Sequence, residues 1–342
     1  MRTRGPGATG TARVEQWGQK ERRGRHTTTI ERRHGMSDVE LEIVPAGEAR
    51  PLLAAVLDRA FEGYNVPVHF SPDVLDAMVE RDGVVLDRSY IAYREGVPVG
   101  VALVAIRPSA GGTRTRLAAM GVLPAERRAG IGQALVGRVI DDARAHGSRD
   151  LLLEVLESNT GARRLYEGHG FAPTRRLLGF SLRDAPLPAA HGGAPRGERV
   201  ALRAPSGPEI LTLFTRCVEG ESPAARPPWQ LDAPFLARLA PSVTAYTITA
   251  SCAGNSAVGY VVLSADRPTM RLLHLGVLPE WRRRGLASAA LAVARATHVD
   301  SEDLRVAALI PEASVLVPFL RARGAVEARE SQIEMAFPLH RR

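Results

Sequence analysis

The feature that most constrains the fold of this chain is an internal repeat. The segment Gly121–Gly132, which reads Gly-Val-Leu-Pro-Ala-Glu-Arg-Arg-Ala-Gly-Ile-Gly, returns as Gly276–Ala287 at an offset of 155 residues. The second copy reads Gly-Val-Leu-Pro-Glu-Trp-Arg-Arg-Arg-Gly-Leu-Ala. Weaker echoes flank the two copies in the same order: Val97–Val101 with Ser256–Tyr260, and Gly168–Phe171 with Ala322–Ala325. Landmarks at a nearly constant offset indicate a duplicated domain rather than one shared motif.

Two domains also suit a chain of 342 residues, about twice the length of a common domain. The folded halves are expected at 37–185 and 198–342, joined by a Pro- and Gly-rich linker at 186–197. Residues 1–36 carry nine Arg or Lys and three Glu, so six of the eight net positive charges lie there. This basic extension has too few apolar residues for a core and is expected to be disordered. It is interpreted as an upstream start or a dispensable extension, with a nucleic-acid-binding arm as the minor alternative.

Composition narrows the class of protein further. Hydrophobic residues make up 45% of the chain and charged residues 24%, as in a soluble globular protein. No apolar run reaches the ~18 residues of a membrane span, and no apolar signal-peptide core follows the start. Cys217 and Cys252 stand in no metal-binding spacing. We therefore expect a cytoplasmic protein with no disulfide, no metal, and neither nucleic acid nor membrane as a partner.

Apolar spacing in the first half alternates between strand and helix periods. Strands are expected at Val39–Val44, Tyr90–Tyr93, Pro98–Ile106, Leu117–Leu123, Leu151–Leu156 and Phe171–Leu182, and helices at Ala49–Phe61, Ile131–His146 and Ala162–Gly168. The nearly continuous apolar run Leu151–Leu156 is typical of a strand covered on both faces. Each half is therefore expected to be an α/β domain with a central sheet and helices on both faces.

The repeated segment lies between a strand and a long helix. There a loop presents backbone N–H groups and the positive end of the helix dipole to one anion. Gly130 and Gly132 leave room for phosphate oxygens near the backbone, while Arg127 and Arg128 add positive charge. A Walker loop would need Gly-Lys-Ser/Thr, and a dinucleotide fingerprint would need a third glycine where Leu135 stands. The segment therefore predicts a pyrophosphate loop of another kind.

The pattern Val-x-Pro-x-x-Arg-x-x-Gly-x-Gly, followed by Asn159-x-x-Ala-x-x-Leu-Tyr166-x-x-x-Gly-Phe171, resembles the GNAT N-acetyltransferase superfamily. The resemblance covers nearly all of 37–185 and, more loosely, 198–342. It implies a tandem GNAT fold with a central, mixed, mostly antiparallel sheet flanked by helices, and acetyl-CoA as co-substrate. The residues that it implies for acetyl-CoA are the end of the preceding strand, the loop and a downstream amide: Met120, Gly121, Val122, Arg127, Arg128, Ala129, Gly130, Ile131, Gly132, Gln133 and Asn159.

Acyl transfer from a thioester to an amine makes two proton demands. The amine, with a pKa near 10, must lose a proton before attack, and the departing thiolate must gain one or be otherwise stabilised. The resemblance places Tyr166 beside the thioester sulfur as the candidate acid; the alternative is a Tyr that packs beside Leu165. The first half has no Cys for an acyl-enzyme intermediate, so direct transfer in a ternary complex is expected.

Glu154 is the candidate base, because it is one carboxylate inside an apolar strand, where a charge is costly unless it is paired. The order Glu-Val-x-x-Ser-Asn…Leu-Tyr resembles the ribosomal-protein alanine N-acetyltransferases, in which the matching Glu is proposed as the general base. A salt-bridged structural Glu is the alternative, and Glu157 is a weaker substitute.

The second half has lost the candidate catalytic side chains. At the downstream offset of 154, Glu154, Asn159 and Tyr166 fall on three apolar residues: Ala308, Ala313 and Leu320. We expect a structural role for this degenerate second domain, with a regulatory coenzyme A site or a second catalytic site as alternatives.

These observations predict an N-acetyltransferase whose active site lies in the first half. The alternatives are a mycothiol-synthase-like tandem acyltransferase, in which the second half would be catalytic, and a non-catalytic coenzyme A-binding sensor or scaffold. The acceptor is expected to be a small-molecule or peptide primary amine. Tyr64 and Phe70 are candidates to line its entrance, with a packed aromatic loop as an equal alternative. The chain is expected to be a monomer or a homodimer.

Overall fold

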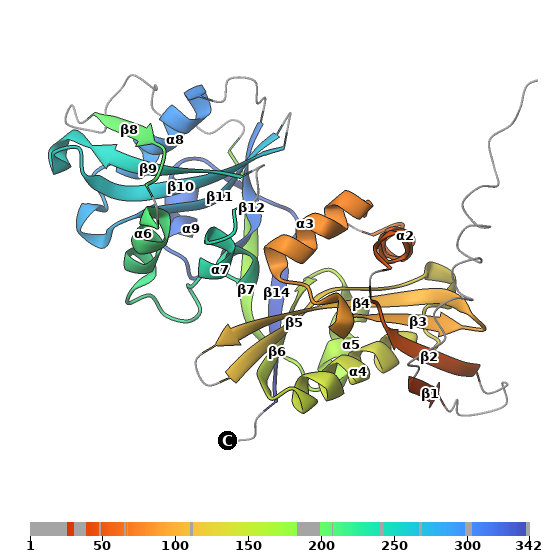
Figure 1. Cartoon of the computed structure of the whole chain (residues 1–342). Coiled ribbons are helices and arrows are strands. Elements are labelled where there is room, and N and C mark those ends of the chain that lie inside the picture. Colours follow the sequence, from red (N-terminus) through yellow and green to blue (C-terminus); the bar gives the residue numbers. More distant parts are fainter. Residues whose placement is uncertain are drawn as a thin grey trace, which may run out of the picture. The chain divides into compact units, whose positions relative to one another are not determined.

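The computed structural model describes residues 26–30, 39–47, 49–64, 66, 68–109, 112–182, 199–206, 208–239, 243–266, 269–297 and 303–339. These residues form two compact units (Figure 1). Unit 1 holds the described residues up to Leu153, Gly161–Ala172 and those from Met335 onwards, and unit 2 holds Glu154–Thr160 and Pro173–Glu334. Within the described ranges, no helix is long and apolar enough to cross a membrane.

The sheet of unit 1 is mixed but mostly antiparallel. Its strands are, in spatial order, β1 (His26–Ile30), β2 (Val39–Pro45), β3 (Tyr90–Arg94), β4 (Val97–Ser109), β5 (Gly112–Val122), β6 (Ser148–Leu156) and β14 (Gln332–Pro338). Neighbours from β1 to β5 pair antiparallel, whereas β5 and β6 pair parallel. The parallel pair requires a crossover, which α4 (Ile131–Ala145) provides.

β1 lies within the extension for which the composition predicts disorder. Its five residues pair antiparallel with β2, from His26 opposite Ile43 to Ile30 opposite Val39. This strand departs from the prediction, because backbone pairing with a neighbouring strand needs no apolar side chains of its own. The rest of 1–36 and the expected linker at 186–197 lie outside the described residues.

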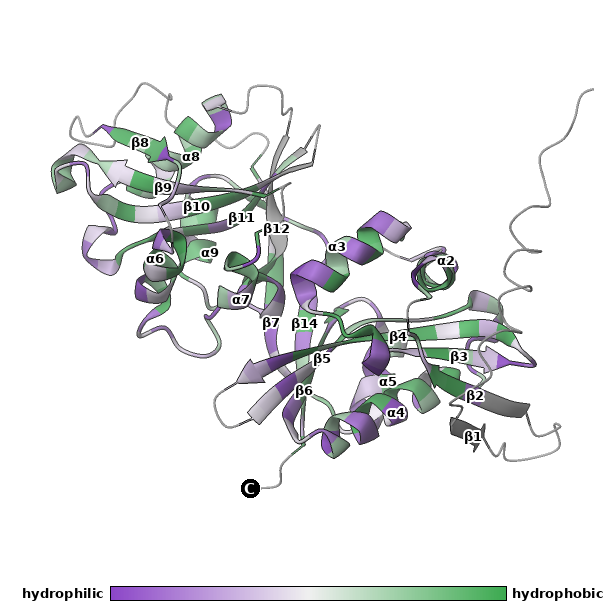
Figure 2. Ribbon diagram, viewed as in Figure 1, coloured by the Kyte–Doolittle hydropathy of each residue, from purple (hydrophilic) through white to green (hydrophobic). Residues whose placement is uncertain are grey.

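Helices cover both faces of the unit 1 sheet. Besides α4, the helices of unit 1 are α2 (Arg50–Ala60), α3 (Pro72–Asp82) and α5 (Thr160–Gly168), with short 3-10 turns η1 (Leu86–Arg88) and η2 (Pro124–Glu126). A Cβ atom added at Gly121 would lie 2.6 Å from Ala60 of α2, whereas one at Gly100 would lie 3.2 Å from Leu135 of α4. Gly100 pairs with Val122, the neighbour of Gly121. Successive strand residues point to opposite faces, so α2 and α4 cover opposite faces. β4 between them is hydrophobic along much of its length (Figure 2).

A β-bulge opens the unit 1 sheet between β5 and β6. Leu103 pairs with Ala119 and Val104 with Leu117, so Ala118 is an extra residue in β5. The recorded pairs between β5 and β6 end at Arg116, before the bulge, although both strands continue. Among the described pairs, the last residues of β5 therefore have a neighbour only on the β4 side.

Unit 2 is built on the same plan. Its sheet contains, in spatial order, β7 (Ala172–Ser181), β12 (Asp303–Pro311), β11 (Thr269–Val277), β10 (Ala257–Asp266), β9 (Val243–Ala250) and β8 (Val200–Arg203), while β13 (Val326–Glu327) pairs with β7. Its helices are α6 (Glu209–Val218), α7 (Ala233–Leu236), α8 (Leu286–Thr297) and α9 (Leu316–Ala322), with 3-10 turns η3 (Trp229–Leu231), η4 (Ser251–Ala253) and η5 (Pro279–Trp281). Val262 pairs with His274 and Leu263 with Leu272, so Leu273 is the bulged residue here. The parallel pairing of β11 with β12 likewise ends at Leu272.

The backbone repeats at the offsets that the sequence shows. The bulged residues Ala118 and Leu273 lie 155 positions apart. At the end of α5 the Phe171 N–H donates to the Tyr166 carbonyl, and at the end of α9 the Ala325 N–H donates to the Leu320 carbonyl, 154 positions on. These matches confirm the predicted fold, a mixed and mostly antiparallel sheet flanked by helices that is present twice.

The two units do not coincide with the two halves of the repeat. β7 follows α5 in the chain, but from Pro173 onwards it belongs to unit 2 and pairs with β12. The last strand, β14, contributes its residues from Met335 onwards to unit 1, where the Leu339 N–H donates to the Arg149 carbonyl at 3.0 Å. Each half therefore needs the other for a complete unit. The domain boundaries proposed from the repeat, 37–185 and 198–342, describe the duplication and stay a prediction.

Candidate functional site

The predicted pyrophosphate loop has a defined backbone. After β5 comes the turn η2, then Arg127 in an extended conformation, and Arg128 and Gly130 with positive φ of 65° and 85°. Helix α4 starts at Ile131, and the Ala134 N–H donates to the Gly130 carbonyl at 3.0 Å. This is the first hydrogen bond within the helix, so the three N–H groups that precede that of Ala134 have no partner inside the helix. They belong to three of the residues predicted for acetyl-CoA: Ile131, Gly132 and Gln133.

The Arg127 side chain is held by the protein backbone. Its Nη2 donates to the Ala60 carbonyl at 2.8 Å, and its Nε donates to the Val122 carbonyl at 3.3 Å. In unit 2, Arg282 Nη2 donates to the Cys217 carbonyl at 2.8 Å and Nε to the Val277 carbonyl at 2.9 Å. The repeated Arg thus connects the end of the strand with the C-terminal end of a helix, which is α2 in the first copy and α6 (Glu209–Val218) in the second. Its conservation within the repeat has this structural cause, which the motif by itself did not reveal.

The end of β5 packs closely against α2, because Gly121 has no side chain on that face. A Cβ at Gly121 would lie 2.6 Å from Ala60 and 3.3 Å from the Phe61 ring, which is too close for a side chain. Met120 and Val122 flank this glycine and are partly exposed. The edge that β5 presents beyond the bulge suits an extended ligand that pairs as an additional strand.

Tyr166 is buried in unit 1. Its side chain is 7% exposed, and its ring lies 5.8 Å from that of Phe171. Burial raises the pKa of the Tyr166 hydroxyl above its ordinary value, and the nearby Tyr64 raises this pKa further. Tyr166 is therefore protonated throughout the physiological pH range, as a proton donor must be.

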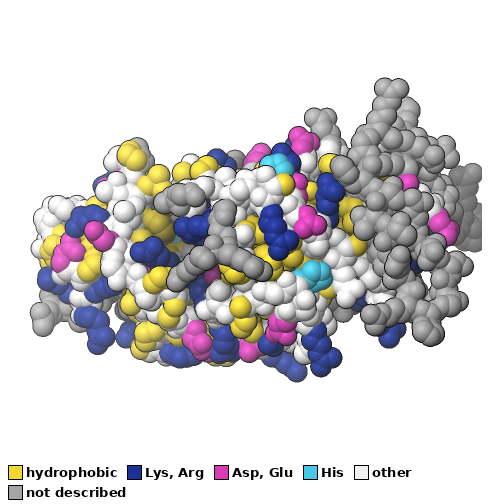
Figure 3. Space-filling model, turned by 90° about the horizontal axis from the view of Figure 1, so that it is seen from below, with side chains coloured by type: hydrophobic (Ala, Val, Ile, Leu, Met, Phe, Trp, Pro, Cys, Tyr) yellow, Lys and Arg dark blue, Asp and Glu magenta, His cyan; other side chains and the backbone are white. Residues whose placement is uncertain are grey.

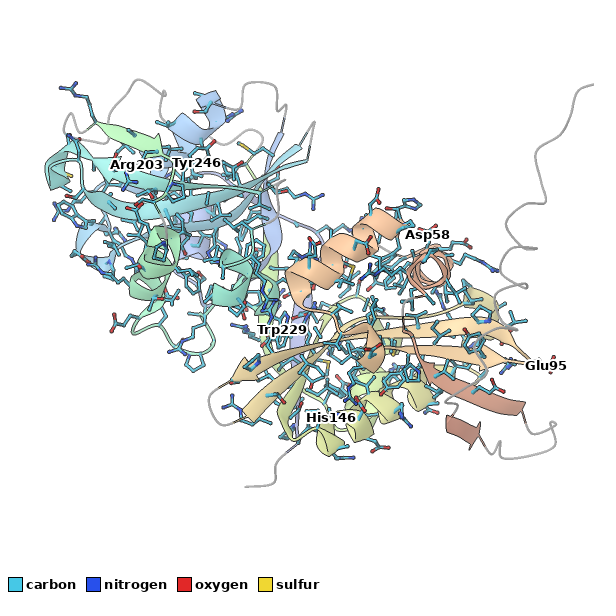
Figure 4. All side chains as sticks on the ribbon, viewed as in Figure 1. Asp58, Glu95, His146, Arg203, Trp229 and Tyr246 are labelled. Atoms are coloured by element: carbon cyan, nitrogen blue, oxygen red, sulfur yellow. The ribbon has the colours of Figure 1, made fainter. Side chains whose placement is uncertain are left out.

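Tyr64 and Phe70 belong to one aromatic cluster, centred on Phe61. The Phe61 ring lies 5.0 Å from that of Tyr64 and 5.1 Å from that of Phe70. The Phe70 N–H donates to Asp58 of α2, labelled in Figure 4, at 2.9 Å. Phe70 is 7% exposed, so it packs within the loop, whereas Tyr64 keeps a partly exposed ring. Their role as acceptor-lining residues stays a prediction.

Glu154 and Asn159 lie in unit 2. Glu154 Oε2 accepts a hydrogen bond at 3.0 Å from Nε2 of Gln230, the residue after Trp229 (Figure 4). Gln230 is a residue of η3 and is 7% exposed. Sequence reasoning missed this partner, because Gln230 is 76 residues away in the second half. Asn159 follows β6, and its N–H donates to the Leu156 carbonyl at 3.0 Å.

Glu157, the substitute candidate for the base, is engaged elsewhere. Its carboxylate accepts hydrogen bonds from Arg176 at 3.1 Å and from the Ser331 hydroxyl. These contacts already engage the carboxylate, and the role of Glu157 as a substitute base stays a prediction.

The second copy keeps the backbone of the pyrophosphate loop but has no counterpart of the Glu154 carboxylate or the Tyr166 hydroxyl. Arg283 and Gly285 have φ of 65° and 79°, which match those of Arg128 and Gly130 within about 6°. The shared end of α5 and α9 places Leu320 where Tyr166 stands. The strand register varies locally, so the counterpart of Glu154 is Ala307, Ala308 or Leu309, none of which has an ionisable side chain.

Unit 2 nevertheless contains a pocket at the opening between β11 and β12. Its polar lining includes Cys217, Glu221, Tyr260, His274 and Arg282. The His274 Nε2 donates to the Leu231 carbonyl, which leaves Nδ1 to accept a hydrogen bond from the Tyr260 hydroxyl at 3.1 Å. Burial lowers the pKa of His274 to about 4 and raises that of the Cys217 thiol to about 12. The sequence did not single out this Tyr–His pair, since Tyr260 entered only as the last residue of a weak echo and His274 lies outside the repeated segments.

Comparison with known proteins assigns the family. The profile of the acetyltransferase (GNAT) family matches residues 52–171 and again 210–310. The chain therefore belongs to the GNAT acetyltransferase family, in which the acyl donor is an acyl-CoA. No curated protein matches the chain.

Solved structures show the same fold at low sequence identity. A GCN5-related N-acetyltransferase from Sphaerobacter thermophilus is 17% identical, with a TM-score of 0.65 over 88% of this chain and 96% of that chain. A tandem GNAT protein from the clavulanic acid biosynthesis pathway is 18% identical, with a TM-score of 0.63 over 88% of this chain and 99% of that chain. These similarities confirm the tandem arrangement.

Proposed function

We propose that the chain transfers the acetyl group of acetyl-CoA to a primary amine by direct attack in a ternary complex, with the active site in the first half. The observation that carries the proposal is an asymmetry between the copies. Both have the loop backbone, but only the first has Tyr166 and Glu154, where the second has Leu320 and uncharged residues. The acceptor chemistry is taken from the family, to which the GCN5-related N-acetyltransferase of Sphaerobacter thermophilus named above belongs.

The two side chains divide the proton transfers. Glu154 takes a proton from the ammonium, which frees the nitrogen lone pair to attack the thioester carbonyl. A backbone N–H near Val122 stabilises the oxyanion of the tetrahedral intermediate. When the C–S bond breaks, Tyr166 gives its proton to the thiolate, and the attacking nitrogen gives up its second proton to restore the tyrosine. The raised pKa of Tyr166 keeps its hydroxyl protonated until the thiolate forms. Because a raised pKa also makes tyrosine a weaker acid, its proton passes to sulfur together with the transfer from the attacking nitrogen.

Charge gives no reason to expect a polyanionic acceptor. On the face shown in Figure 3, Lys and Arg side chains are interspersed with Asp and Glu. Most of the net charge lies in residues 1–36. The acceptor is therefore proposed to be a small-molecule or peptide amine, selected by shape at the loop that carries Tyr64.

Release of free coenzyme A in the presence of a panel of primary amines tests this function. We expect Tyr166→Phe to lower kcat by about 10²- to 10⁴-fold, the usual contribution of a positioned acid, with acetyl-CoA affinity unchanged. Tyr260→Phe is the matched control, since it removes a buried hydroxyl from the second copy, and it should leave kcat unchanged. The reverse pattern would place the chemistry in the second half.

A catalytic or sensory second half is the alternative that the pocket between β11 and β12 favours. Titration of acetyl-CoA into Gly130→Glu and Gly285→Glu separates the two. Both glycines have φ near 80°, so backbone strain is matched, and the added carboxylate repels a pyrophosphate. Loss of binding in Gly130→Glu alone supports the first half. Loss in Gly285→Glu alone supports the alternative.

A further inference from the structure

We propose that Gln230, a residue of the second half, positions Glu154 and also accepts a hydrogen bond from the nitrogen of the acceptor amine. This inference rests on the proposed function, in which Glu154 is the base. It gives the second half a part in the reaction of the first.

The orientation of the Gln230 amide follows from its partner. An ionised carboxylate can only accept hydrogen bonds, so the atom 3.0 Å from Glu154 Oε2 is the donor Nε2. The amide oxygen Oε1 then lies on the other branch of the same planar group, about 2 Å from Nε2. An acceptor is thus fixed on the same amide group whose Nε2 contacts the carboxylate.

The side chain is held firmly in this orientation. Its neighbours in η3, Trp229 and Leu231, are each 6% exposed. The Leu231 N–H donates to the Pro228 carbonyl at 2.9 Å, which closes the turn. The amide therefore projects from a packed segment and does not reorient as a surface glutamine would.

Gln230 Oε1 is a buried acceptor to which no residue of the described part of the chain donates. Such atoms are rare in folded proteins, because burial without a hydrogen bond is unfavourable. Where they occur beside a candidate catalytic group, a ligand donor is the natural partner. Oε1 and Glu154 together offer two acceptors, which suits a group with several N–H donors.

A primary ammonium has the donors that this pair requires. One N–H points to Glu154 and passes its proton there, and a second N–H points to Gln230 Oε1. Deprotonation breaks one N–H bond and forms an O–H bond on Glu154, and the hydrogen bond to Oε1 holds the neutral amine while its lone pair attacks. Of the two protons that the nitrogen loses in all, one leaves through Glu154, and the other balances the proton that the departing thiolate gains.

The test variant is Gln230→Met, which keeps the length of the side chain and removes both hydrogen bonds. The probe is the primary amine on which the wild type is most active in the panel described above. We expect kcat/KM for the amine to fall by about 10- to 100-fold, the effect of one or two lost polar contacts to charged groups. We expect the KM for acetyl-CoA, and the slow hydrolysis of acetyl-CoA without amine, to stay unchanged. A merely structural role would not separate aminolysis from hydrolysis.

Thr249→Val is the matched control. Thr249 is also a buried polar residue of the second half, 8% exposed, and its hydroxyl donates to the Ala201 carbonyl at 3.4 Å. This variant should keep wild-type kinetics.

The outcomes separate the inference from the function on which it rests. If Glu154→Gln abolishes acetylation while Gln230→Met matches the wild type, the role of Gln230 is refuted and the proposed base stands. An equal loss of aminolysis and hydrolysis in Gln230→Met also refutes it. If Glu154→Gln is fully active, the assigned base is wrong and the role of Gln230 falls with it. If no primary amine is acetylated, the proposed function itself fails.

Discussion

Replacing Arg127 by Leu distinguishes a loop arginine that binds an anion from one that supports the loop. The motif places Arg127 among the residues for acetyl-CoA, whereas in the structure its guanidinium donates to the Ala60 and Val122 carbonyls. We therefore expect Arg127→Leu to affect folding stability first and acetyl-CoA affinity only indirectly. Arg282→Leu in the second copy is the matched variant.

The magnitude follows from the two hydrogen bonds. A hydrogen bond from a charged donor contributes roughly 1.5–3 kcal/mol. The 2.8 Å bond to Ala60 counts most, because the 3.3 Å bond to Val122 is long and Arg127 is exposed. We expect a loss of about 1–2 kcal/mol for Arg127→Leu. Arg282 makes two short bonds and is 30% exposed, so Arg282→Leu should lose about 3 kcal/mol.

Urea unfolding and calorimetric titration of acetyl-CoA measure the two effects. We expect the midpoints of unfolding to fall in the order wild type, Arg127→Leu, Arg282→Leu, and the Kd of Arg127→Leu to stay within about threefold of the wild type. Wild-type stability with an affinity at least tenfold weaker, and a reduced salt dependence of binding, would instead show that Arg127 contacts the anion directly. That result would refute the structural reasoning.

Two further expectations concern stability. Burial lowers the pKa of His274 to about 4, against 6.5 in the unfolded chain, so the free energy of unfolding should fall by at most about 3 kcal/mol as the pH drops from 6.5 toward 4. Unfolding curves of His274→Leu should have a weaker pH dependence in this window. An unchanged pH dependence would contradict the assignment. The ring centroids of Phe337 and Phe171 lie 5.5 Å apart, and the Arg144 guanidinium lies over the Phe337 ring in unit 1. Phe337→Ala should therefore destabilise the first-half site by about 2 kcal/mol, which would be measured as faster hydrogen exchange in α5. Faster exchange in α9 alone would contradict this placement.

Much of the loop could be predicted from sequence because its constraints are local. Gly130 has a φ of 85°, a conformation that favours glycine, and the apolar spacing after it matches the buried residues of α4: Ile131, Leu135, Val136, Val139, Ile140 and Ala143. The duplication was visible for the same reason, since each copy must rebuild the same turn from its own residues.

The site residues in the first half could be predicted only in part. The family resemblance proposed Tyr166, and the apolar strand proposed Glu154, but the burial that raises the Tyr166 pKa depends on packing such as that against Phe171. The nearby Tyr64 raises this pKa further. The role of Arg127 also escaped the motif, because its partner Ala60 is 67 residues away.

The sequence by itself determined the tandem GNAT fold, the loop and the loss of candidate catalytic groups from the second copy. Only the tertiary structure decided which residues complete each unit: β14 from the end of the chain in unit 1, β7 from the first half in unit 2, and Gln230 against Glu154. The physical reason is that turns and amphipathic helices depend on neighbours within a few positions. Strand pairing and buried hydrogen bonds instead depend on segments that lie far apart in the sequence. The local pattern of apolar residues does not specify which distant segment pairs with a given strand edge or polar group.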